Sequence, residues 1–307
     1  MEKNKVLRIS EAARSVFYIP LLATVGGGFL EKEGYQGILG TEPGKGAERL
    51  KQLEQGVVDI LGNTPTLSFL WLEQQVKGDL PLQVAALTHR DGFFIVGRDS
   101  APQFKWKDLE GAELITSNFS LQPLASLRMC LFQNISAPMD NIKILSDFAT
   151  MNSAAQAFKE GQGDFVHLQE PLASILVEEN KGYILASVGE CLGPLAFSTV
   201  AMSRQFIENR REAAEAFIRA YHATLRWIET SDAEEIAEAT CQLFEGASKS
   251  ILVASIKNYQ SIGAWRSDLV ISKASYERMV DMWIEAGHMK KRYPYEQVVS
   301  NRLVQKV

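Results

Sequence analysis

The sequence predicts an α/β protein of two similar lobes, each a mostly parallel sheet flanked by helices, with a helical C-terminal part. Three observations predict this class. Short apolar runs of strand length alternate with helical stretches through residues 6–202. One pattern, in which a glycine, an acid, an apolar strand and a polar turn with proline follow a helix, occurs at both 56–66 and 161–171. Residues 205–286 carry apolar side chains at helical spacing.

The first copy of this pattern is the centre of the prediction. Gly56 suits a helix C-cap, because glycine adopts the left-handed backbone at low cost. The apolar run 57–61 predicts a short buried strand, and Asn63 or Thr64 would cap the next helix, with Pro65 near its first position. Small ligands bind at the carboxyl ends of strands in open α/β sheets. The alternative is an ordinary strand–helix junction.

The remaining elements follow from their own residues. The other predicted strands are 6–10, 35–41, 82–87, 92–96, 112–116, 142–146, 183–188 and 197–202, besides the strand of the second pattern copy. The predicted helices are 16–32, 47–55, 66–76, 121–133, 154–159, 205–230, 232–243, 248–259 and 273–286. Three glycines at 26–28 interrupt the first helix, which predicts close packing or a bend there. Residues 88–91 predict a hairpin or crossover loop, 98–108 a linker and 189–194 a glycine-rich turn.

Composition limits the function classes. The chain has 307 residues, enough for one large or two ordinary domains, and its 46% hydrophobic and 22% charged residues are typical of globular proteins. A net charge of -5 gives no electrostatic footprint for nucleic acid and no polybasic segment for a membrane surface. No apolar stretch is long enough for a membrane span. The first residues, Met-Glu-Lys-Asn-Lys, include no apolar stretch, so no secretory signal is expected in this chain.

Two possible motifs are rejected. Residues 42–46 invite a phosphate-loop interpretation, but the lysine followed by serine or threonine is absent, so a plain loop into the next helix is predicted. Cys130, Cys191 and Cys241 are odd in number and widely spaced, which favours neither a disulfide framework nor a zinc site. We therefore expect each cysteine to be a small buried hydrophobic residue.

The order of segments resembles the type II periplasmic-binding-protein fold. The closest group contains the sulfonate-, nitrate- and taurine-binding components of ABC transporters and the related thiamin-pyrimidine synthases. The resembling segments are 28–34, 50–60, 107–111 and 157–161, followed by Asp164 and Glu170-Pro171. The resemblance implies a discontinuous lobe I of residues 1–97 and 196–307 and a lobe II of residues 98–195. A ligand would lie in the cleft between the lobes, which would close around it by hinge motion.

The resemblance also implies where the ligand contacts lie, because the strand-to-helix turns converge on such a cleft. Helix N-termini suit an anionic group, and Arg14 or Arg90 would pair with a carboxylate or sulfonate. Phe17, Phe93 or Phe119 would stack on a flat ligand. The predicted ligand-binding residues are Arg14, Ser15, Phe17, Asn63, Thr64, His89, Arg90, Asn118, Ser120, Met151, Asn152, His167, Gln169 and Glu170.

Marks of the enzymes that share this fold are missing. Where the thiamin-pyrimidine synthases have a lysine and a histidine, this chain has Asn63 and Leu67, and their cysteine-rich run is reduced to Cys191. Where desulfinases of the fold have a cysteine, Arg14-Ser15 stands. Both departures favour binding over catalysis, so no catalytic residue, metal or cofactor is predicted.

The predicted function is that of a solute-binding protein, the substrate-binding component of an ABC importer, for a small organic anion or heteroaromatic compound. Its expected partners are this ligand and permease subunits. It would be periplasmic or otherwise extracytoplasmic if a signal peptide was removed, and cytoplasmic if the chain is complete. The alternative is a cytosolic enzyme or ligand sensor, such as a lyase, a decarboxylase or an enzyme of pyrimidine-precursor biosynthesis. That alternative would use the groups at 89–91 and 167–170 as acid and base.

Overall fold

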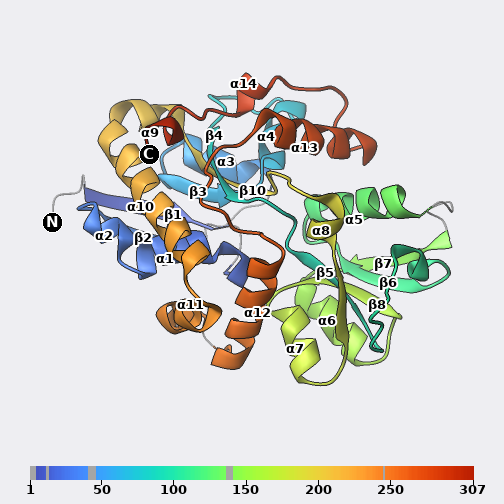
Figure 1. Cartoon of the computed structure of the whole chain (residues 1–307). Coiled ribbons are helices and arrows are strands. Elements are labelled where there is room, and N and C mark those ends of the chain that lie inside the picture. Colours follow the sequence, from blue (N-terminus) through green and yellow to red (C-terminus); the bar gives the residue numbers. More distant parts are fainter. Residues whose placement is uncertain (1–4, 12–13, 41–45, 136–140, 245) are drawn as a thin grey trace. The chain divides into compact units, whose positions relative to one another are not determined.

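A computed structural model describes residues 5–11, 14–40, 46–135, 141–244 and 246–307. It confirms the predicted α/β class, with two five-stranded sheets flanked by helices (Figure 1). Contacts divide the chain into unit 1, residues 1–89, 195–247 and 265–307, and unit 2, residues 90–194 and 248–264. Residues 90–97 and 248–264, which the sequence-based division placed in lobe I, thus group with unit 2.

The sheet of unit 1 has the strand order β2-β1-β3-β10-β4. Its strands are β1 (Val6–Ser10), β2 (Gln36–Gly40), β3 (Ile60–Asn63), β4 (Leu82–Thr88) and β10 (Ser198–Met202). β1 pairs in parallel with β2 and β3, whereas β10 is antiparallel to both β3 and β4. The polar turns after β1 and β3 therefore leave the sheet at the same edge.

Helices cover both faces of this sheet, with α1, α2 and α10 on one side and α3 and α4 on the other (Figure 1). The helices of unit 1 are η2 (Val16–Tyr18), α1 (Ile19–Gly26), α2 (Phe29–Lys32), α3 (Ala47–Glu54), α4 (Thr66–Glu73), α9 (Arg204–Asn209), α10 (Arg211–Thr230), α11 (Ala233–Thr240), η5 (Cys241–Leu243), α13 (Lys273–Glu285), α14 (Tyr295–Val298) and η6 (Val304–Lys306). Two predicted helices are broken. Helix 16–32 is interrupted at Gly28, whose φ is 74°, and helix 205–230 at Arg210, whose φ is -129°.

The sheet of unit 2 has the order β7-β6-β8-β5-β9. Its strands are β5 (Phe93–Gly97), β6 (Glu113–Ser117), β7 (Lys143–Phe148), β8 (Phe165–Gln169) and β9 (Tyr183–Ser187). β6 is parallel to β7 and β8, and β5 lies antiparallel between β8 and β9. Because β4 and β5 belong to different sheets, residues 88–91 form a crossover and not a hairpin.

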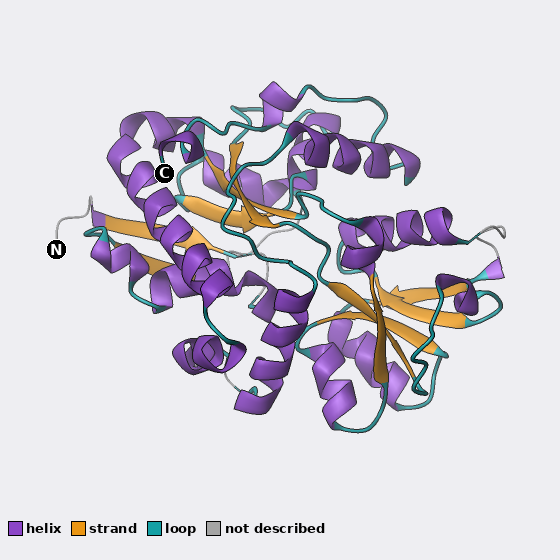
Figure 2. Cartoon of the chain, viewed as in Figure 1, coloured by secondary structure: helices purple, strands orange, loops and turns teal. Residues whose placement is uncertain are grey.

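The helices of unit 2 are η3 (Trp106–Leu109), α5 (Leu121–Asn134), α6 (Met151–Lys159), α7 (Leu172–Glu178), α8 (Val188–Leu192) and α12 (Lys249–Ser261). α6 and α7 pack on one face of the sheet and α12 packs on α7, while α5 and α8 lie together on the other face (Figure 2). The glycine-rich stretch 189–194 was predicted as a turn, but most of it belongs to α8.

The prediction for two cysteines is wrong, because Cys130 of α5 and Cys191 of α8 form a disulfide with Cα atoms 6.0 Å apart. They are separated by 61 positions and meet only because α5 packs against α8, which the spacing of cysteines does not reveal. Cys241 is free and exposed, not buried as predicted.

Of the rejected phosphate-loop stretch, residues 42–45 lie outside the described residues. Among the helices that the structure describes, none combines the length and the apolar character that crossing a membrane requires.

Candidate ligand-binding residues

In unit 1 a charged cluster surrounds the chain that follows β1. Glu11 is fully buried, and its Oε1 accepts a hydrogen bond from Arg14 Nε at 2.8 Å. Arg49, on the buried face of α3, donates from Nη2 to the Glu11 carbonyl oxygen at 2.6 Å and lies 3.4 Å from the Ser10 hydroxyl. Arg14 therefore pairs with the Glu11 carboxylate, while Arg49 binds the backbone of the same residue. Arg14 was predicted from the sequence and Arg49 was not, because an arginine in the first turn of a helix carries no local signal of a site.

Asn63 ends β3 with an incomplete set of hydrogen bonds. The residue is 1% exposed, and among the described residues its amide has one hydrogen-bonding neighbour, the Thr199 hydroxyl, 3.3 Å from Oδ1. That hydroxyl lies only 2.7 Å from Oε1 of Gln83, so its single proton serves Gln83. Whichever way the Asn63 amide is turned, one of its two polar atoms keeps no partner in the described part of the chain. The Thr64 hydroxyl, next along the chain, contacts the Thr66 hydroxyl at 3.1 Å.

The other predicted residues of unit 1 have structural contacts. Ser15 caps η2, because its Oγ accepts from the backbone N–H of Phe17. The Phe17 ring is fully buried and lies edge-on to Tyr18 and Phe197, in the core. Nε2 of His89 lies 2.7 Å from a backbone carbonyl oxygen, and burial lowers the pKa of this histidine, which keeps it neutral at pH 7. Ligand contact by these three residues stays a prediction.

In unit 2 three stacked rings lead from the core to the surface. His167 of β8 is fully buried and stacks on Phe93 with ring centroids 4.4 Å apart. Phe93 in turn stacks with Phe119 at 6.3 Å, and Phe119 is 45% exposed. His167 Nδ1 lies 3.1 Å from the Thr116 hydroxyl, whereas its Nε2 has no partner among the described residues. Burial lowers the pKa of His167 to about 3, so the ring is neutral.

Further polar residues follow β6, β7 and β8, whose carboxyl ends lie at one edge of the sheet because the three strands are parallel. The predicted residues there are Asn118 and Ser120 after β6, Met151 and Asn152 after β7, and Gln169 and Glu170 at the end of β8. Ser117, which the prediction missed, is 2% exposed, and its Oγ has no partner in the described chain. Arg90 binds within unit 2, from Nη1 to the Gly189 carbonyl oxygen at 3.1 Å.

Glu170 is held by the protein itself. Its carboxylate accepts from the backbone N–H and hydroxyl of Ser174, both at 2.9 Å, and from Asn258 Nδ2 at 2.6 Å. Burial raises the pKa of this carboxyl, and the contacts tie the start of α7 to α12. Its role as a ligand contact stays a prediction, since its oxygens already have partners.

The described residues give limited support to catalysis or metal binding. Within them, no three His, Cys, Asp or Glu side chains are grouped so that they could hold a metal ion. Asp91 is buried, which raises its pKa to about 7, and its Oδ1 accepts from the backbone N–H of Phe93. The pKa of Asp91 near 7 would suit a general base at neutral pH. The pKa of His167, about 3, is too low for that role.

Comparison with known proteins agrees with the predicted resemblance. A Bacillus subtilis (strain 168) protein, YtlA, whose name marks it provisionally as a binding protein, is 26% identical over 304 residues, which cover 98% of this chain and 89% of that protein. The nitrate-binding protein NrtA of Synechocystis is similar in structure, with a TM-score of 0.74, 13% identity, and coverage of 98% and 88%. The alkanesulfonate-binding protein SsuA of Xanthomonas axonopodis, bound to MOPS, has a TM-score of 0.69, 18% identity, and 97% coverage of both chains. The NMT1-like family model matches residues 14–244, and the chain belongs to the NMT1-like family.

Proposed function

We propose that this protein is a solute-binding protein, the substrate-binding component of an ABC importer. It would hold a small organic anion or heteroaromatic compound in a cleft between unit 1 and unit 2, which close around the ligand by hinge motion. Its macromolecular partners would be permease subunits. The fold of sulfonate- and nitrate-binding proteins supports this proposal.

One observation carries the proposal. Each unit holds, in the last three residues of a strand, buried polar atoms that lack a partner in the described chain: an amide atom of Asn63 in unit 1, and Ser117 Oγ and His167 Nε2 in unit 2. A buried polar group left unsatisfied costs roughly 1–3 kcal/mol. A bound ligand that supplied the missing hydrogen bonds would recover this free energy. These atoms are therefore suited to contact a ligand.

The chemistry of the two units supports the ligand class. In the unit 1 cluster, Arg14 pairs with the buried Glu11 carboxylate and Arg49 binds a neutral backbone carbonyl oxygen, so these three side chains together carry a net positive charge, which suits an anionic group. The unit 2 stack ends in the exposed ring of Phe119, which offers a flat face to a heteroaromatic ring. The neutral His167 offers a hydrogen bond without adding charge.

We also infer that the protein works outside the cytoplasm. The Cys130–Cys191 disulfide supports this location, because disulfides persist in oxidising compartments and are rare in the cytosol.

A thermal-shift screen against small sulfonates, carboxylates and pyrimidines tests the proposal. A ligand that binds only the folded state adds about 2.7 kcal/mol of stability at a hundredfold excess over its Kd. In a chain of this size we expect the midpoint to rise by at least about 2 °C. The ligand should then be recovered chemically unchanged. A ligand that is consumed would support the enzyme alternative, and no shift across the panel would count against this ligand class.

A further inference from the structure

The outer edge of β9 is open, unlike the corresponding edge in the other sheet. β9 is the last strand of the unit 2 sheet and pairs only with β5 among the described residues. The outer edge of β4 in unit 1 is covered, because Ala86 N–H donates to the Leu269 carbonyl oxygen and Ser300 N–H to that of Gln83. Open strand edges present unpaired N–H and C=O groups that can pair with another chain.

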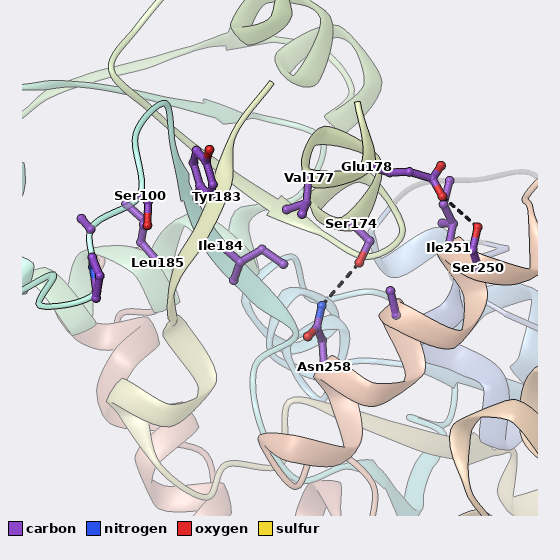
Figure 3. Close-up of a pocket in the computed structure, with 13 residues that line it drawn as sticks. Ser100, Ser174, Val177, Glu178, Tyr183, Ile184, Leu185, Ser250, Ile251 and Asn258 are labelled. Atoms are coloured by element: carbon purple, nitrogen blue, oxygen red, sulfur yellow. Dashed lines mark hydrogen bonds between the residues drawn. The ribbon is translucent and has the colours of Figure 1, made fainter. Parts of the chain in front are cut away.

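A hollow of about 770 Å³ lies along this open edge. It is lined by residues 183–185 of β9, by α7, by α12 and by residues 100–102. Figure 3 shows Tyr183 and Leu185 on the side of Ser100, and Ile184 on the side of α7 and α12. The hollow therefore lies on both sides of the strand, as it must if an added strand is to place alternate side chains on both.

The surface of the hollow is mostly apolar and partly exposed. Val177 and Tyr183 are 40% and 48% exposed, and both line it. Exposed apolar side chains that gather in one place mark interaction sites more often than scattered ones do. The polar groups nearby are already bonded in part, since Ser250 donates to Glu178 at 2.8 Å and Asn258 lies 3.4 Å from the Ser174 hydroxyl (Figure 3).

The edge carries negative charge. A second hollow of about 210 Å³ adjoins the first and shares Ala101 and Leu185 with it. The charged residues that line the two are Glu178, Asp99, Asp108, Asp164 and Arg98. The guanidinium of Arg98 is held by three backbone carbonyl oxygens, those of Phe158, Gln162 and Gly163. Four carboxylates and one guanidinium together leave a net charge of -3 on the lining of the two hollows, which favours a cationic partner.

We propose that an extended segment of a partner protein, with alternating apolar residues and at least one lysine or arginine, docks on β9 as an additional antiparallel or parallel strand. Main-chain hydrogen bonds would supply affinity and the hollows on both sides would select side chains. A second copy of this chain is a poorer occupant, because pairing two β9 edges would bring their carboxylates together. This partner surface is separate from the ligand residues of the proposed function.

Selection from a display library of random seven-residue peptides tests this proposal. The library is panned on the whole protein and depleted on the Val177→Lys variant, which places a charge in the hollow. We expect enriched peptides to alternate apolar residues, to carry lysine or arginine, and to lack proline at central positions. No enrichment after depletion, or enrichment of acidic peptides, would overturn the proposal.

The affinity of one enriched peptide, labelled with fluorescein, is then measured by fluorescence anisotropy. Val177→Lys should weaken binding at least about tenfold. Val270→Lys is the matched control, because Val270 is also 40% exposed but lies in unit 1, and it should leave the Kd unchanged. N-methylation of alternate peptide amides should abolish binding, since it removes main-chain donors. If the methylated and unmethylated peptides bind with equal affinity, strand addition is contradicted. The proposed partner is also contradicted if sedimentation shows a dimer of the wild type that Val177→Lys abolishes, because the edge would then bind a second copy of this chain.

Discussion

The two copies of the repeated sequence pattern share one hydrogen-bonding device but differ in what surrounds it. In unit 1, Asp59 donates its N–H to the Arg8 carbonyl oxygen, and its carboxylate accepts the Arg8 N–H at 2.8 Å. In unit 2, Asp164 makes the same two contacts with Glu113. Each acid thus ties the start of a central strand to the neighbouring parallel strand. The repeat therefore specifies the framework of a lobe.

The difference begins at the side chains. Asp59 is nearly buried and is also paired with two guanidinium groups, those of Arg8 and Arg210, whereas Asp164 is exposed. Further along each strand, unit 1 has Asn63 at the end of β3, which pairs with the strand that leads into the charged cluster, and unit 2 has the neutral His167 in a stack of rings. A shared framework with different strand-end chemistry is suited to a ligand with two unlike ends.

The largest expected effect concerns the disulfide, a covalent brace that the described residues show in unit 2 and not in unit 1. Replacing Cys130 and Cys191 by serine should lower the free energy of unfolding by about 4 kcal/mol, because the bond closes a loop of 61 residues. Hydrogen exchange should show the loss in unit 2 peptides. Cys241→Ser is the control and should have no effect. If peptides of unit 1 lose as much protection from hydrogen exchange as those of unit 2, the disulfide does not stabilise unit 2 selectively.

The two acids should differ in their contribution to stability. Asp59→Ala should cost about 3 kcal/mol, because it removes a nearly buried carboxylate that accepts hydrogen bonds from the Arg8 backbone and from the Arg8 and Arg210 guanidinium groups. Asp164→Ala removes one exposed hydrogen bond and should cost about 1 kcal/mol. Urea denaturation measures both. If the two substitutions lower the free energy of unfolding equally, the hydrogen bonds that both acids make to the neighbouring strand, and not the ion pairs of Asp59, determine their contribution to stability.

His167 should give the wild-type protein a measurable loss of stability in acid. It is neutral in the folded state with a pKa of about 3, but an unfolded histidine protonates near pH 6.5, so the unfolded state binds more protons below that pH. Stability is therefore full above pH 6.5 and falls as the pH is lowered towards 3. Between pH 7 and pH 5 the wild type should lose about 2 kcal/mol more than His167→Gln. If the free energy of unfolding of the wild type and of His167→Gln changes equally with pH, His167 is not buried in its neutral form and the prediction is wrong.

Local patterns in the sequence predicted most of the framework. The strand 6–10 is present as β1, and Gly56 has the predicted positive φ of 69° just after α3. These features depend on neighbouring residues, which a sequence displays directly. Asn63 was predicted to lie beyond a strand 57–61 and, with Thr64 as the alternative, to cap the next helix. It is instead the last residue of β3, and α4 is capped by Pro65 without a side-chain hydrogen bond.

Features that depend on distant segments could not be predicted in this way. Arg49 reaches the chain after β1 from another helix, and Cys130 meets Cys191 only after two helices pack. Periodicity says which face of a helix is buried but not which partner covers it. The neutral state of His167 likewise depends on burial by Phe93 and its neighbours, not on adjacent residues.

The central claim is that one ligand contacts the strand ends of both units. Isothermal titration with the strongest compound from the thermal-shift screen tests it most directly, on the wild type, Asn63→Ala and His167→Gln. The claim predicts that each variant, one in each unit, weakens binding at least about tenfold, or 1.4 kcal/mol, while remaining folded. If only one variant loses affinity, or neither does, the ligand is not held by these strand ends of both units and the claim is contradicted.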